Sequence, residues 1–189
     1  MPGVRVIRTG RLLETTSRFP SLQENLRVYA VIVTLVYAWT ILWLFWELPS
    51  WLHFLTIPEV LPLFAYALTT NLLETGLVLL GLNLLAALLP RRWFRSSFVA
   101  RSFWLVAFGL GYLMVFASLL GKEEEYPAGM LAWSPLVFGA LFLGSLLLDR
   151  LPRARLLAEL VADRLTIFLY LTIPLSLLSA LVVLVRNAW

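Results

Sequence analysis

Residues 61–89 read LPLFAYALTTNLLETGLVLLGLNLLAALL, a run that contains a single charged side chain, Glu74. At 1.5 Å per residue, a helix over this run is about 44 Å long, which exceeds the ~30 Å hydrocarbon core of a bilayer. The run is also too long and too continuously apolar for a strand of a membrane barrel, whose segments alternate in polarity over about ten residues. We therefore expect a transmembrane helix that tilts, kinks or protrudes from the bilayer.

Four further apolar runs have the length of membrane spans, and short loops separate them. Hydrophobic residues make up 61% of the chain and charged residues 14%, and the mean hydropathy is +0.87. Because lipid offers the backbone no hydrogen bonds, such runs are expected to be helices. The sequence predicts an all-α integral membrane protein, in which a polar arm (1–27) precedes one domain of five transmembrane helices (28–189). The predicted spans are residues 28–46, 61–89, 102–120, 131–148 and 165–185.

The positive charges indicate the orientation of this bundle. Thirteen arginines lie in the N-terminal arm and in the loops after the second and fourth runs, whereas the other side has only Lys122 and Arg186. Cytoplasmic loops carry an excess of Lys and Arg, so the N-terminus is predicted in the cytoplasm and the C-terminus outside. We expect the cell (inner) membrane of a prokaryote, with the mitochondrial inner membrane as the second choice.

Local signals predict where the first helix begins and ends. The segment Ser21–Glu24 fits a capping box, in which each side chain satisfies a free amide at a helix start. The first helix is therefore expected to begin near Leu22, before it enters the lipid. Pro49 is expected to end it, because proline lacks the amide that a helix needs.

The loop between the fourth and fifth runs has a helical pattern of its own. Its apolar residues share one stripe of a helix, whereas its charged residues lie off that stripe. We predict a short amphipathic helix over residues 151–164 that lies on the cytoplasmic leaflet. A solvated connector is the alternative. The stripe consists of Leu156, Leu157, Leu160 and Val161.

Glu74 is the principal candidate for a functional residue. It lies near the middle of the second run, where an acid is costly and is therefore often functional. Asn71 and Thr70 fall close to it on a helical wheel, so the three are expected to form a polar cluster. In one interpretation Glu74 exchanges protons or binds a cation with help from Asn71 and Thr70. In the other, a protonated Glu74 joins two helices by hydrogen bonds.

Small and polar residues predict the packing faces of the helices. On the second run, Thr69, Gly76 and Asn83 recur every seven residues on the side opposite Glu74, which predicts a central helix packed on both sides. Pairs of small residues four positions apart let two helices approach closely. Such pairs occur in the third and fourth runs: Ala107 with Gly111, and Ala140 with Gly144.

The residue types exclude several kinds of site. The chain has no cysteine and one histidine, His53, so neither a thiolate metal site nor a haem with two histidine ligands can form within it. His53 as the single ligand of a haem or pigment stays open, and no other cofactor or metal is indicated. The arginines flank apolar runs and make no basic face, so no nucleic-acid partner is expected. Sequence motifs for catalysis are absent.

Three functional hypotheses remain. The first is an accessory or structural subunit of a larger membrane complex, whose partners are the lipid bilayer and other membrane subunits or further copies of itself. The second is an oligomeric transporter or channel that couples protons or cations through Glu74. The third is a membrane enzyme acting on lipid phosphates, whose headgroups would be held by Arg91, Arg92 and Arg95. We lean away from an enzyme.

Overall fold

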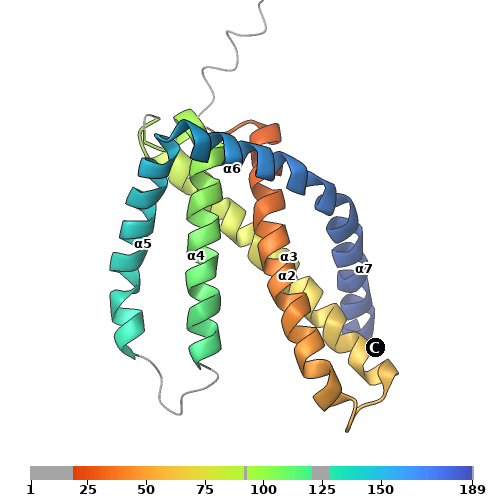
Figure 1. Ribbon diagram of the computed structural model, residues 1–189. Helices are drawn as coiled ribbons and strands as arrows, with labels where there is room; N and C mark the ends of the chain where they lie inside the picture. The colour runs from red at the N-terminus through yellow and green to blue at the C-terminus, as the bar shows by residue number, and fades with distance from the viewer. Residues whose placement is uncertain (1–18, 92, 121–127, 189) are drawn as a thin grey trace, which may run out of the picture.

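The computed structural model describes residues 19–91, 93–120 and 128–188, which are helical and contain no strand (Figure 1). Five helical stretches of this part of the chain are long and apolar enough to cross a membrane, so the predicted number of spans is confirmed. The chain is therefore a polytopic membrane protein. The long helices are α2 (Leu22–Trp51), α3 (Ile57–Leu88), α4 (Phe98–Leu120), α5 (Ala128–Asp149), α6 (Pro152–Leu165) and α7 (Leu169–Ala188). Single 3-10 turns precede α4 (η1, Arg95–Ser97) and α7 (η2, Thr166–Phe168).

Capping boxes begin the first two helices. The Glu24 carboxylate accepts hydrogen bonds from the amide and the hydroxyl of Ser21, both at 2.8 Å, which confirms the predicted start of α2. A second box, unnoticed in the sequence, begins α3 four residues before the predicted span. There the Glu59 carboxylate accepts from the amide (2.8 Å) and the hydroxyl (2.7 Å) of Thr56. The start of each helix is thus defined by hydrogen bonds between neighbouring residues that lie outside the apolar run.

The prediction that Pro49 ends the first helix is wrong. α2 continues through Pro49 to Trp51, and the amide of Leu52 still donates to the carbonyl of Leu48 at 3.1 Å. A proline removes only its own backbone donor. So close to the end of α2, the loss of one bond leaves the last turn in place.

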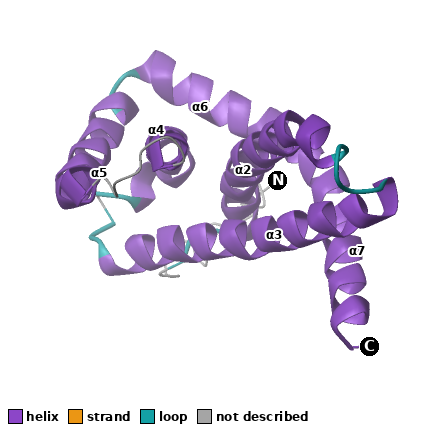
Figure 2. Cartoon of the chain, turned by 90° about the horizontal axis from the view of Figure 1, so that it is seen from below, coloured by secondary structure: helices purple, strands orange, loops and turns teal. Residues whose placement is uncertain are grey.

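α2 is the central helix, and α3 crosses it obliquely (Figures 1 and 2). α2 contacts α3, α4, α6 and α7, and it supplies much of the buried core through Val28, Ala30, Val31, Ile32 and Val33. Among the described helices α2 is therefore the central one, and packing of the second span on both sides stays a prediction, because one of its partners can belong to another protein. α3 packs on α2 and α7 and leaves one long side exposed. An oblique path is one way in which a helix longer than the hydrocarbon core is accommodated in a bilayer.

α6 lies across one end of the bundle, which we call the α6 end, and contacts α2 and α4 (Figure 1). Its contacts use two fully buried alanines, Ala158 and Ala162, whereas the leucines of the predicted stripe are exposed. An ion pair of 3.0 Å between Arg27 and Asp163 ties α6 to α2. The connector is therefore helical over Pro152–Leu165, and it runs through η2 directly into α7.

Candidate functional site

A chain of hydrogen bonds between side chains joins α2 to α3. At the α6 end, the amide of Asn83 donates to the amide oxygen of Asn25 at 2.9 Å. About two turns into α2, the hydroxyls of Tyr29 and Thr75 share a hydrogen bond of 3.4 Å. We call these contacts, together with those of Tyr37 and Thr40 below, the polar seam. Such bonds satisfy polar groups where lipid offers them no partner.

The polar seam continues to α7 and to the middle of the bundle. Tyr37 shares a hydrogen bond with Ser176 of α7, and its hydroxyl also donates to the carbonyl of Leu68 at 3.4 Å. Next along α2, the hydroxyl of Thr40 donates to the amide oxygen of Asn71 at 3.0 Å. Nothing in the sequence indicates that these tyrosines bind across helices, because a tyrosine in an apolar run also fits a lipid-facing position.

The three residues of the predicted polar cluster face different surroundings. Asn71 is buried against α2, and within the described residues its amide nitrogen has no hydrogen-bond partner. Thr70 is exposed and donates to the carbonyl of Tyr66 in its own helix at 3.0 Å. Glu74 is exposed as well, and it makes no hydrogen bond or ion pair within residues 19–91, 93–120 and 128–188. Asn71 therefore belongs to the polar seam, and Glu74 stands apart from it.

An open apolar groove of about 520 Å³ adjoins the face of α3 that carries Glu74. Its walls come from α3, α4 and α5, and include Val78, Gly81 and Leu85 of α3. Glu74 precedes these residues by four, seven and eleven positions, the spacing of one helix face. The carboxyl group thus lies one turn from the groove on the same side of α3. The remaining walls are Leu82, Leu105, Val106, Gly109, Leu110, Leu113, Phe138 and Phe142.

The residues predicted to face the other side of α3 have separate environments. Asn83 belongs to the polar seam. The hydroxyl of Thr69 donates to the carbonyl of Ala65 in its own helix at 2.7 Å. Gly76 is exposed, and no described atom of a neighbouring element lies within 4 Å of the point where a Cβ would stand. These three residues therefore do not form one packing face within this chain.

Close contact between α4 and α5 uses a glycine other than those predicted. A Cβ built on Gly109 would lie 3.5 Å from the ring of Phe138, whereas the same position on Gly111 or Gly144 is open within the described part of the chain. The alanines of the predicted pairs are half-buried (Ala107) and exposed (Ala140). Within the described residues, Gly109 and neither Gly111 nor Gly144 therefore lies at the close contact between α4 and α5.

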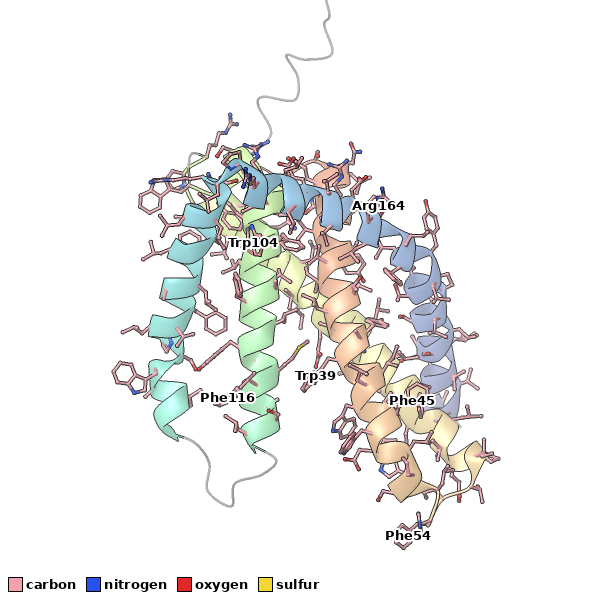
Figure 3. The ribbon with its side chains drawn as sticks, in the orientation of Figure 1. Trp39, Phe45, Phe54, Trp104, Phe116 and Arg164 are labelled. Carbon is pink, nitrogen blue, oxygen red and sulfur yellow. The ribbon has the colours of Figure 1, made fainter. Side chains whose placement is uncertain are left out.

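Charged side chains gather at the α6 end, where Figure 3 labels Arg164. There Arg101 of α4 binds Asp149 of α5, with its Nη2 and Nε 2.7 Å and 2.9 Å from the same carboxylate oxygen. Both residues are 9% exposed, so this is a buried ion pair, whereas the sequence places Arg101 among the loop charges. The feature of the sequence that could have indicated this ion pair is Asp149, an acid at the end of the fourth apolar run.

The predicted headgroup residues lie in the connection between α3 and α4. Arg91 is exposed and Arg95 is half-buried, and both make further interactions with their surroundings. Arg92 lies outside the described residues, as do the arginines of the N-terminal arm before Phe19. Arg91 and Arg95 stay predicted contacts for lipid phosphates.

His53 lies in the connection between α2 and α3, at the end opposite α6. It is exposed, and its Nδ1 is 2.7 Å from the carbonyl oxygen of Pro49. Across the described residues no group of three or more histidine, cysteine or acidic side chains is placed to hold a metal ion. The Nδ1 atom thus contacts the backbone, and His53 as the single ligand of a haem or pigment stays a prediction.

Comparison with protein-family models, with curated proteins and with solved structures found no match to this chain. The proposed function therefore rests on the side chains of this protein alone. Two features of the surface stand out within the described residues: the exposed carboxyl group of Glu74 and the apolar groove beside it.

Proposed function

We propose that this protein is an accessory or structural subunit of a larger membrane complex in the inner membrane of a prokaryote, with its N-terminus in the cytoplasm. The observation that carries the proposal is the position of Glu74. This acid lies near the middle of α3, on the exposed side of the helix, without a hydrogen-bond partner among the described residues. A surface of this kind suits contact with protein better than contact with lipid.

The cost of Glu74 in lipid supports this proposal. An acid at the centre of a membrane helix costs about 2.5 to 3.5 kcal/mol on insertion scales, and such residues almost always face protein or water. The polar seam shows that other mid-span polar side chains of this chain bond to one another, as Thr40 does with Asn71, although the amide nitrogen of Asn71 has no partner among the described residues. Glu74 makes no hydrogen bond or ion pair among the described residues, so we infer that a neighbouring protein satisfies it.

The same residue supports a second candidate, an oligomeric transporter or channel coupled to protons or cations. Because Glu74 faces outward, it lines no passage through a single copy of the chain. Several copies around an axis would bring their Glu74 side chains to a shared interior. This candidate predicts a homo-oligomer, and it predicts that Glu74→Gln abolishes proton or cation flux in reconstituted vesicles.

Purification from native membranes in a mild detergent tests the proposed function. Mass spectrometry of the preparation is expected to find at least one other membrane protein in fixed stoichiometry. Glu74→Gln is expected to lower the recovery of that partner, whereas Tyr170→Phe, an exposed position on α7, leaves it unchanged. A pure homo-oligomer would favour the transporter, and a monomer without partners would contradict both candidates.

A further inference from the structure

We propose that the partner covers Glu74 with a transmembrane helix that carries lysine, arginine or histidine at the depth of Glu74 and lies along the groove between α3, α4 and α5. The inference rests on the proposed function and adds to it the place and the chemistry of the contact. It combines two separate features, an acid without a described partner and an unfilled apolar surface beside it.

Glu74 and the groove form one continuous surface. Val78, Gly81 and Leu85 line the groove and follow Glu74 on the same face of α3. A helix in the groove would therefore pass Glu74 at one point and touch apolar side chains over the next three turns. The apolar side chains would add buried area to the contact, and the pairing with Glu74 would define the position of the partner helix along α3.

The shape of the groove suits a helix. In lipid a single added segment must be helical to satisfy its backbone. Helices in membranes associate where small residues let their backbones approach. Gly81 lies in the wall of the groove, and no described atom of a neighbouring element lies within 4 Å of the point where its Cβ would stand. The incoming helix can thus lie close to α3.

Charge complementarity selects a basic side chain. The walls of the groove are apolar, so they give a carboxylate no donor. The hydroxyl of Thr70, which precedes Glu74 by four residues, already donates to the carbonyl of Tyr66. Hydrogen bonds between ionised groups are about twice as strong as neutral ones, and intramembrane acids pair with basic residues. A lysine, arginine or histidine on the partner helix would supply this bond.

A second copy of this chain cannot supply that group. No lysine or arginine occurs between Arg27 and Arg91, and none occurs in residues 102–120, 131–149 or 165–185. The one histidine, His53, lies in a connection at the end of α2. A parallel copy would bring a second Glu74 to the first. Acyl chains of lipids carry no donor either, so the partner is a different protein.

Photo-crosslinking in native membranes tests this inference. A benzophenone amino acid at Leu85, a partly exposed position in the groove, is expected to crosslink to another protein, and sequencing of the crosslinked peptide is expected to find a transmembrane segment with a lysine, arginine or histidine. The matched control at Leu171, on the exposed surface of α7, is expected to give no such product. Glu74→Gln is expected to lower the crosslinking yield roughly fivefold, since a polar contact between membrane helices has about this effect.

A charge exchange completes the test. Glu74→Lys is expected to abolish the crosslink, and replacement of the partner's basic residue by glutamate is expected to restore it. Thermal unfolding in detergent checks the fold of each variant, and Glu74→Gln should unfold as the original chain does because Glu74 has no described internal partner.

Three results would overturn the inference: a crosslinked segment without a basic residue, a crosslink to another copy of this chain, or adducts with lipid alone. If a stoichiometric partner still co-purifies in any of these cases, the proposed function stands and only the contact surface is wrong. If no partner co-purifies, both proposals fail.

Discussion

Tyr37 of α2 and Ser176 of α7 share a buried hydrogen bond across 139 residues of sequence. Ser176 is fully buried and Tyr37 is 3% exposed, and the tyrosine hydroxyl also reaches the carbonyl of Leu68 in α3. One phenol group therefore holds three helices together. Because hydrogen bonds of this kind form only when all three helices are in place, they select one arrangement of otherwise similar apolar surfaces.

Tyr37→Phe is expected to lower the free energy of unfolding by about 0.6 to 1.7 kcal/mol, the range measured for hydrogen bonds between membrane helices. The substitution removes only the hydroxyl and keeps the ring in the core. Unfolding by SDS in mixed micelles measures the change. Tyr170→Phe is the matched control, because Tyr170 is 84% exposed. Equal effects of the two substitutions would contradict the role of Tyr37.

Thr40→Val is expected to destabilise the protein by about 1 kcal/mol, because it leaves the buried amide oxygen of Asn71 without its donor. Thr34→Val is the control, because it makes the same substitution at another threonine of α2. The hydroxyl of Thr34 donates to the carbonyl of Ala30 in its own helix, so its loss leaves no group of another helix without a partner. The midpoint of thermal unfolding in detergent compares the two variants. A larger effect at Thr34 would count against the polar seam.

Asp149→Asn is expected to destabilise the contact between α4 and α5 by about 3 kcal/mol, because it removes the negative charge that the buried Arg101 binds. Glu159→Gln is the control, since the pair Arg155–Glu159 is exposed and lies within α6; its loss is expected to cost under about 0.5 kcal/mol. Chemical denaturation in detergent measures both. Similar small effects would show that the buried pair adds little to stability.

Cysteine labelling tests the predicted orientation, because the chain has no cysteine of its own. Ser50 and Ser96 are exposed at opposite ends of the bundle. In intact cells, a membrane-impermeant maleimide is expected to label Ser50→Cys and to label Ser96→Cys only after permeabilisation. The reverse pattern would contradict the orientation derived from the arginines.

Much of the architecture was predictable because lipid imposes a length and a composition on every span. The apolar runs predicted the number of candidate spans, and Ser21 with Glu24 predicted the first residue of α2. Thr56 with Glu59 would have predicted the start of α3 in the same way. These features depend on neighbours in the sequence, so no knowledge of the tertiary structure is needed to find them.

The sequence by itself thus determined the helices, their caps and the place of Glu74 in the middle of its apolar run. Only the tertiary structure decided which way each helix faces: Asn71 turns inward to Thr40 while Glu74, three residues later, turns outward. It also decided that α2 is central and that Arg101 meets Asp149. The physical reason is that a membrane helix is apolar on its buried side and on its lipid side alike, so hydrophobicity does not mark the interior. Packing and hydrogen bonds between distant residues mark it instead.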